Sequence, residues 1–440
     1  MTDRPTDAAP EPGDDAGLAA TSAGARQPGD DAESGRVGEP DDSGARTRGS
    51  ALEVLGQFTV LGLTSFGGPV AHFGYFRERL VVRRRWISEQ GYADLVALAQ
   101  FLPGPASSQV GFALGLHRAG ILGGLAAFAA FTLPSAVLLV LAALGAPLLE
   151  GALAEGLIAG LKVVAVAVVA HAVWGMARAL TPDLRRAAIA VVAGLMVLLI
   201  GTGWATLVAI ALGAAAGLLL CRAAVSSAPA RLSIPISRTA GAICLGVFAL
   251  LLLGLPVLAA LVPNQSLAVA DGFFRAGALV FGGGHVVLPL LETAVVEPGW
   301  VSESQFLAGY GAAQAVPGPL FTVAAFLGAS ITPGAHGVLL AGVALVAVFV
   351  PGLLLIAGVL PFWGALQGRP SVQALVRGAN AAVVGVLAAA LYDPVMTSAL
   401  VDTPTAALAV LCTVLLIVAR LPAWVIVIIG VGGGVLLAAF

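Results

Sequence analysis

The sequence predicts an all-α integral membrane protein with two inverted structural repeats of transmembrane helices, each containing broken or re-entrant segments. Three observations support this fold class. Hydrophobic residues make up 59% of the 440 residues and charged residues only 10%, whereas a soluble domain is about 25% charged. Apolar stretches of about 20 residues, the length that crosses a bilayer, recur along the chain. Motifs containing glycine, proline and tryptophan recur in the same order in both halves.

The first 50 residues differ from the rest of the chain in composition. They contain eleven acidic residues and five arginines, a net charge of −6, and are rich in glycine, proline, alanine and serine. Because they lack the apolar periodicity of a folded core, residues 1–50 are predicted to be a disordered acidic tail on the cytoplasmic side. The tail is not a signal peptide, since no apolar core follows a basic start.

The remaining chain divides into two similar parts joined by a short connection. Residues 51–222 form the first predicted repeat and residues 267–440 the second, and both contain apolar stretches such as Ile121–Leu144 and Val338–Leu360. Residues 223–266 hold a cytoplasmic linker and one further apolar stretch, Gly241–Val262, which has no counterpart in either repeat. This extra transmembrane helix would invert the second repeat relative to the first.

The repeat is carried by glycine, proline, tryptophan and glutamine residues, which chance rarely places twice in one order. The spacing between partners drifts only from 214 to 220 residues. The matched segments are Phe66-Gly67-Gly68 with Phe281-Gly282-Gly283, Trp86-Ile87-Ser88-Glu89 with Trp300-Val301-Ser302-Glu303, Gln100 and Pro103-Gly104-Pro105 with Gln314 and Pro317-Gly318-Pro319, Pro134 with Pro351, Gly160 and Lys162 with Gly378 and Asn380, and Trp204 with Trp424.

The charges of the loops predict the orientation of the two halves. The loop Arg77–Arg85 carries five arginines and one glutamate, whereas its counterpart, Leu291–Pro298, has two glutamates and no basic residue. The loop Arg178–Arg186 carries three arginines, and its counterpart, Asp393–Asp402, has two aspartates and no basic residue. Because basic loops stay in the cytoplasm, the two halves are predicted to lie in opposite orientations.

The paired glycine and proline motifs break apolar segments in corresponding places, which indicates a substrate path. Broken backbone at membrane depth is tolerated where it is buried in protein or lines a water-filled cavity, and freed helix N-termini suit an anion. The alternative is that the breaks are kinks that only shape the bundle. The predicted path residues are Gly67, Gly68, Pro69, Gln100, Pro103, Gly104, Pro105, Ser108, Gly282, Gly283, Gly284, Gln314, Pro317, Gly318 and Pro319.

Ionisable side chains in apolar surroundings are the remaining candidates. Lys162 lies within a long apolar run and could face an anion, with Asn380 as its counterpart in the second repeat, or it could extend to the interface. His72 and His285 follow the two glycine motifs and could carry a coupling proton or simply end a helix. Arg77 and Arg275 could attract anions, although the arginines near Arg77 also fix topology.

The ordered series of motifs resembles the chromate ion transporter family in its long, two-domain form. The first half shows Ser65-Phe66-Gly67-Gly68-Pro69, His72, Arg77, Trp86, Glu89, Gln100 with Pro103-Gly104-Pro105, and Ser108-Gln109; the second shows Phe281-Gly282-Gly283-Gly284-His285, Trp300, and Gln314 with Pro317-Gly318-Pro319. The resemblance covers about residues 52–440, and the acidic tail is not part of the family pattern.

The resemblance implies a secondary active transporter that exports chromate and confers chromate resistance, in the inner membrane of a prokaryote. It implies chromate and sulfate as competing oxyanions, whereas the residues alone indicate only an anion transporter. A sulfate or other oxyanion carrier and a membrane-bound reductase are the alternatives. No cofactor, metal or nucleic acid is expected, the bilayer is the surrounding partner, and a homodimer stays open. Transport would proceed by rocking of one half against the other.

Overall fold

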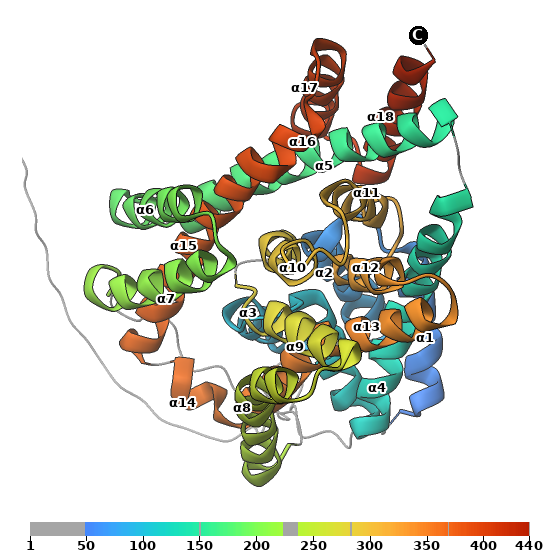
Figure 1. The fold of residues 1–440 in the computed structure, drawn as a ribbon. Helices are drawn as coiled ribbons and strands as arrows, with labels where there is room; N and C mark the ends of the chain where they lie inside the picture. Colours follow the sequence, from blue (N-terminus) through green and yellow to red (C-terminus); the bar gives the residue numbers. More distant parts are fainter. Residues whose placement is uncertain (1–48, 149–150, 223–235, 282–283, 368, 440) are drawn as a thin grey trace, which may run out of the picture. The chain divides into compact units, whose positions relative to one another are not determined.

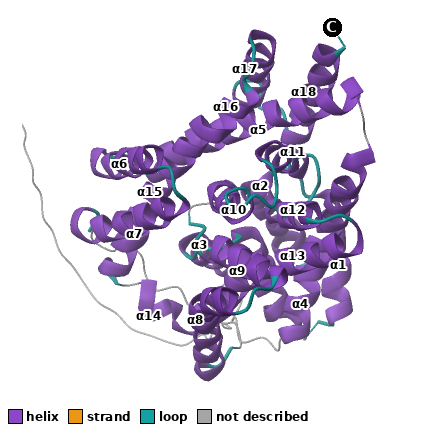
Figure 2. Cartoon of the chain, in the orientation of Figure 1, coloured by secondary structure: helices purple, strands orange, loops and turns teal. Residues whose placement is uncertain are grey.

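The fold described here is that of a computed structural model, which describes residues 49–148, 151–222, 236–281, 284–367 and 369–439. Within these residues the chain forms helices and loops without strands (Figure 2). The predicted acidic tail, apart from its last two residues, lies outside the described residues, as do most of the predicted linker and the site residues Gly282 and Gly283. The predicted all-α class is confirmed.

The first repeat begins with short helices and continues with long ones (Figure 1). The extra helix predicted between the repeats is α8, Arg238–Leu261. The elements of the first repeat are α1 (Ala51–Thr64), α2 (Gly68–Phe76), η1 (Arg77–Arg83), α3 (Glu89–Phe101), α4 (Ala106–Gly145), η2 (Ala146–Leu148), α5 (Gly151–Leu180), α6 (Leu184–Ile200) and α7 (Gly203–Leu220).

The second repeat follows the same order with more interruptions. Its elements are α9 (Gln265–Ala278), η3 (Gly284–Val286), α10 (Val287–Val295), α11 (Glu303–Ala313), η4 (Leu320–Thr322), α12 (Val323–Ile331), α13 (Gly334–Val359), η5 (Leu360–Phe362), α14 (Trp363–Gln367), α15 (Pro370–Ala390), η6 (Leu391–Met396), α16 (Thr397–Ala399), α17 (Thr403–Ile417) and α18 (Ala423–Ala438).

Five helical segments in the described part of the chain are long and apolar enough to cross a membrane. They are Ala106–Leu148, Gly151–Leu180, Arg238–Leu261, Gly334–Leu366 and Pro370–Ala399. Shorter apolar helices, among them α17 and α18, accompany them. Leucine, isoleucine and valine side chains remain exposed along these helices, as is expected where lipid is the solvent. The chain is therefore a multi-pass membrane protein.

The repeated Trp-x-Ser-Glu motif starts a helix in both halves. The side chain of Ser88 accepts a hydrogen bond from the amide of Gly91 and begins α3. Ser302 does the same for Gln305 at the start of α11, where a complete capping box forms. A serine at this position satisfies an amide that the helix itself leaves unpaired. The motif thus sets the starting point of the helix that leads to each Pro-Gly-Pro break.

In the first repeat, the segments before and after the Phe-Gly-Gly and Pro-Gly-Pro breaks all meet at Glu53. Trp86 donates its indole N–H to Glu53 at the start of α1 (3.2 Å). Arg118, at the end of the first part of α4, forms an ion pair with the same Glu53 (3.0 Å). The chain therefore passes this place before the Phe-Gly-Gly motif, between the two motifs, and after the Pro-Gly-Pro motif. Since α1 rises only about 21 Å and a bilayer core measures about 30 Å, α1 alone is too short to cross the core, as expected of the predicted re-entrant segments.

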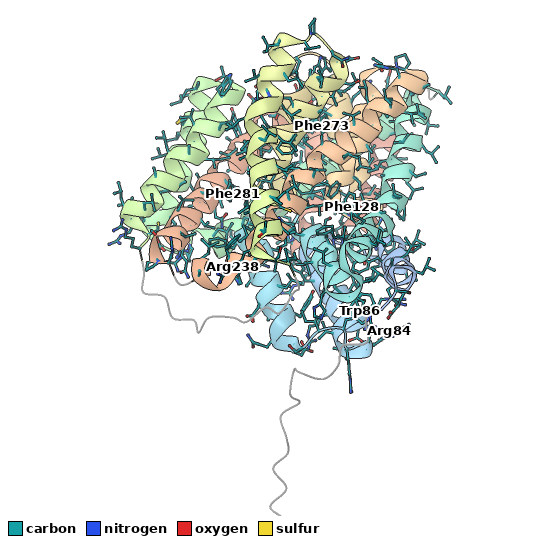
Figure 3. The ribbon with its side chains drawn as sticks, turned by 90° about the horizontal axis from the view of Figure 1, so that it is seen from below. Arg84, Trp86, Phe128, Arg238, Phe273 and Phe281 are labelled. Atoms are coloured by element: carbon teal, nitrogen blue, oxygen red, sulfur yellow. The ribbon has the colours of Figure 1, made fainter. Side chains whose placement is uncertain are left out.

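The labelled side chains in Figure 3 mark the two ends of the bundle and the level between them. Arg84 and Trp86 lie toward the same end as Arg238, the first residue of α8, and Phe273 of α9 lies toward the other end. Phe281, which opens the second Phe-Gly-Gly motif, lies between these levels. Phe281 therefore lies away from both ends.

The long helices of the two repeats exchange partners. Helix α5 of the first repeat packs on α17 and α18 of the second, and α15 of the second packs on α6 and α7 of the first. Glycines allow the close approach, because a Cβ at Gly160 would collide with the backbone of Gly430, and one at Gly378 with the backbone of Gly213. The molecule thus contains a hairpin group (α1–α4 and α9–α13) and a long-helix group (α5–α7, α15, α17 and α18), each drawn from both repeats (Figure 1).

Candidate substrate path

Each Pro-Gly-Pro break is hydrogen-bonded to the Phe-Gly-Gly segment of the other repeat. The amide of Gly104 donates to the carbonyl of Val280 at 2.7 Å, and the amide of Gly318 donates to the carbonyl of Ser65 at 2.9 Å. The donors are repeat partners of each other, and the acceptors each directly precede the phenylalanine of a motif. The two bonds are therefore equivalent under the repeat, and they join the four predicted motifs into two cross-repeat pairs.

Both central glycines adopt backbone conformations that other residues avoid. Gly104 has φ +119° and Gly318 has φ +109°, a region that is sterically unfavourable for residues with a Cβ. A Cβ on Gly104 would lie 2.9 Å from the Cα of Gly352, and one on Gly318 would lie 2.8 Å from the hydroxyl of Ser135. Ser135 and Gly352 directly follow the repeated prolines Pro134 and Pro351, so these prolines mark the surface on which each break rests.

The two Phe-Gly-Gly motifs also approach one another. A Cβ built on Gly284 would lie 3.5 Å from the ring of Pro69, so the end of one motif lies against the end of the other. Gly67 (φ +99°) is the N-cap of α2, and Pro69 occupies its first turn, where a proline costs no hydrogen bond. Phe66 packs against Trp424 of α18, with ring centroids 6.4 Å apart. The first motif therefore contacts both helix groups.

Several buried polar groups surround these contacts without a hydrogen-bond partner in the described part of the protein. They are the hydroxyls of Ser65, Ser108 and Thr132, the side-chain oxygen of Gln109 and the side-chain nitrogen of Gln314. Gln109 also donates to the carbonyls of Pro103 (2.9 Å) and Gly352 (3.1 Å). Uncharged groups of this kind can line a path for a hydrated or hydrogen-bonded anion.

Other predicted path residues differ in their surroundings. Pro105 is the N-cap of α4, so the amides of the following residues head this helix. Pro317 and Pro319 are buried beside Gly318, and Pro103 is half-buried. Gln100 is exposed near the end of α3, whereas its counterpart Gln314 is half-buried. Thr132, Ser135 and Gly352 were not predicted, and only their position beside the repeated prolines could have identified them.

The two histidines lie in different surroundings. His72 is fully buried and packs edge-on against Phe131, with ring centroids 5.2 Å apart. His285 is half-buried, and its Nδ1 lies 2.7 Å from the hydroxyl of Tyr310, a fully buried residue of α11. His285 thus connects the second Phe-Gly-Gly motif to the helix that leads to the second Pro-Gly-Pro break.

Lys162 and Asn380 have different surroundings. The Lys162 ammonium donates to the carbonyl of Ser398 at 3.4 Å, beyond the π-helical η6 in which Asp393 departs from helical geometry. Asn380 lies on α15, before that break. Its side-chain oxygen has no partner in the described residues. Leu161, next to Lys162, packs against Gly311 of α11, shortly before the second Pro-Gly-Pro break.

The two candidate arginines both have carboxylate partners. Arg77 forms two hydrogen bonds with Glu89, of 2.9 and 2.8 Å, on the exposed surface near the first hairpins. Arg275 forms an ion pair with Asp271 one turn earlier on α9, at 2.7 Å. Arg275 also lines a cavity of about 220 Å³ together with Trp204 and Glu297. Among the described residues, neither guanidinium forms a hydrogen bond with the Pro-Gly-Pro breaks.

Comparison with known proteins supports the relation suggested by the motifs. The family model described as "Chromate transporter" matches residues 52–218 and 267–436. A protein of Synechococcus elongatus named a probable chromate transport protein is 30% identical over 368 residues, which cover 78% of this chain and 84% of that relative.

Two further relatives carry the name chromate transport protein. The one from Pseudomonas aeruginosa is 29% identical over 359 residues, covering 78% of this chain and 80% of the relative. The one from Cupriavidus metallidurans is 29% identical over 377 residues, covering 82% of this chain and 86% of the relative. No solved structure shows significant similarity to the chain.

Proposed function

Because the chain belongs to the chromate transporter family, we propose that it carries chromate across the membrane and exports it from the cytoplasm. The observation that supports this most is the pair of cross-repeat hydrogen bonds, from Gly104 to Val280 and from Gly318 to Ser65. They bring broken backbone and uncharged polar side chains together deep inside an apolar bundle, which is the usual construction of a transporter's substrate site.

The proposed path binds a tetrahedral dianion by hydrogen bonding. Ser65, Ser108 and Thr132 provide hydroxyl groups, and Gln314 provides an amide nitrogen. The N-terminal amides of α4 add donors and the positive end of a helix dipole. Because these donors fit any small tetrahedral dianion, sulfate is proposed to compete with chromate.

The contacts between the two repeats also indicate which parts of the protein move relative to each other during transport. Rocking one repeat against the other would break both cross-repeat bonds and separate α5 from α18 and α15 from α7. Movement of the hairpin group against the long-helix group would keep all of these contacts. We therefore propose that access alternates between these two groups and not between the sequence repeats.

The proposed topology places the N-terminal hairpins and α8's first residue on the cytoplasmic side of the inner membrane. Cysteines introduced at Arg83 and Val296, after Cys221, Cys244 and Cys412 are replaced by alanine, would test it. A membrane-impermeant maleimide added to intact cells should label position 296, and label position 83 only after the membrane is permeabilised. Labelling of both positions from the same side would contradict the inverted arrangement.

Uptake of radioactive chromate into everted membrane vesicles tests the proposed activity. Vesicles containing the protein should show saturable uptake that excess sulfate inhibits, whereas vesicles without it should not. Collapsing the proton gradient distinguishes proton coupling, which would stop uptake, from anion exchange or uniport. Absence of uptake by protein that is present and folded would refute chromate transport and leave another oxyanion as the substrate to be tested.

A further inference from the structure

A second cavity lies away from the hairpins, at the ends of three helices of the long-helix group. It has a volume of about 660 Å³ and opens at the turn between α5 and α6, the end of α7, and the side of α15. Its lining residues are Asp183, Leu184, Arg185, Arg186, Leu220, Cys221, Arg222 and Arg377. Helices α6 and α7 come from the first repeat and α15 from the second, so the cavity lies where the two repeats meet.

The cavity is strongly basic. Four of its eight lining residues are arginines, and one is an aspartate. Asp183 pairs with Arg186, and hydrogen bonds from the backbone and guanidinium of Arg186 lower the pKa of Asp183. The aspartate therefore stays ionised and offsets one arginine, which leaves an excess of three positive charges around one opening.

Part of this arrangement has a structural explanation. Arg185 donates to the carbonyl of Leu220 at 3.1 Å, and Arg377 donates to the carbonyl of Cys221 at 3.2 Å. These bonds satisfy carbonyls at the end of α7 that lack helical partners. Each bond uses one of the five N–H groups of a guanidinium, and Arg377 donates another to the side-chain oxygen of Gln373 at 2.9 Å. The capping bonds do not account for Arg222, and Asp183 offsets only Arg186, so a third arginine beside the two capping arginines is unfavourable unless an anion binds there.

The neighbouring surface is apolar. Leu184, in the lining, is 86% exposed, and Leu219, next to the lining residue Leu220, is 81% exposed. Arginines beside exposed leucines at the ends of apolar helices are typical of the interface between lipid head groups and acyl chains. A ligand with a phosphate and hydrocarbon chains would match both parts of this surface.

We propose that this cavity binds the phosphate group of an anionic phospholipid, with the guanidinium groups on the phosphate oxygens and the acyl chains along Leu184 and Leu219. Guanidinium groups suit phosphate because they can donate two parallel hydrogen bonds to it. The lipid would join α7 to α15 and thereby stabilise the contact between the repeats. This site is independent of the proposed substrate path.

Thermal unfolding of the full-length protein in an uncharged detergent tests the proposal. Tryptophan fluorescence would follow unfolding with phosphatidylglycerol, phosphatidylcholine or inorganic phosphate added. Phosphatidylglycerol should raise the midpoint by about 2–4 °C, and the other two additions by less than about 1 °C. An equal rise with inorganic phosphate would overturn the lipid assignment and indicate a site for free anions.

The double variant Arg186→Gln/Arg222→Gln keeps both capping arginines and should lose most of the rise. The control variant Arg84→Gln/Arg178→Gln removes the same charge from arginines outside the cavity and should keep it. Equal rises in the two variants would refute the site. If the first variant does not fold, Arg222→Gln alone should retain less phosphatidylglycerol than Arg84→Gln in native mass spectrometry, and equal retention would refute the proposal.

Discussion

Replacing Gly318 or Gly104 by alanine is expected to lower chromate transport by at least about tenfold, with similar losses at the two positions. Alanine would have to adopt φ near +109° or +119°, at a cost of about 1–3 kcal/mol. Its Cβ would also press on Ser135 in one case and on Gly352 in the other. The strain would be relieved by moving the break, which would weaken the bond to Ser65 or Val280.

Two glycines serve as controls for this experiment. Gly120 has φ +64° but open space around it, and Gly246 lies inside α8 with open space and no unusual φ. Gly246→Ala should have no effect, and Gly120→Ala should show the effect of backbone strain without crowding. Vesicle uptake, normalised to the amount of protein in the membrane, is the measurement. Wild-type uptake by both Gly104→Ala and Gly318→Ala would remove the breaks from the transport mechanism.

Lys162→Ala is expected to reduce transport by at least about tenfold while leaving the amount of protein in the membrane normal. The ammonium group lies in a half-buried position on α5 and donates to the carbonyl of Ser398. A charged group held at membrane depth can attract a dianion strongly because the surroundings screen it little. Loss of the charge should therefore raise the chromate concentration needed for half-maximal uptake.

A second variant separates the charge of Lys162 from its hydrogen bond. Lys162→Gln removes the charge but keeps an N–H donor, on a side chain one atom shorter, whereas Lys162→Arg keeps both the charge and the donor. If the charge acts on the anion, glutamine should behave like alanine, and arginine should retain part of the uptake. If glutamine transports as well as the wild type, the residue only stabilises the end of α16, and its role in anion binding would be wrong.

The sequence predicted the positions of the motifs, but not which Pro-Gly-Pro break is hydrogen-bonded to which Phe-Gly-Gly segment. The repeat of Phe-Gly-Gly, Trp-x-Ser-Glu and Pro-Gly-Pro is visible because glycine, proline and tryptophan have special backbone or packing roles, and the helices begin and break where these residues stand. The bonds from Gly104 to Val280 and from Gly318 to Ser65 were not predictable, because they join backbone atoms. Backbone amides and carbonyls are present at every position and leave no trace in residue identity.

The contacts of charged residues could not be predicted from the sequence pattern either. Lys162 and Asn380 are equivalent in the repeat, and equivalence suggested that they share a site. In a pair of inverted repeats, however, equivalent residues are related by a rotation and come together only where they lie near its axis. Lys162 donates to the Ser398 carbonyl, beyond the non-helical Asp393, whereas Asn380 lies on α15 before it. Three-dimensional packing, not repeat position, decides which residues meet.

The exchange of partners between the repeats has a consequence for how the protein is made. Until α15 and α18 have been synthesised, α5 and α7 lack the glycine-lined surfaces on which they pack. The first Pro-Gly-Pro break likewise lacks the Val280 carbonyl until the start of the second repeat has been synthesised. The newly inserted first repeat is therefore incompletely packed until the ribosome has finished the second.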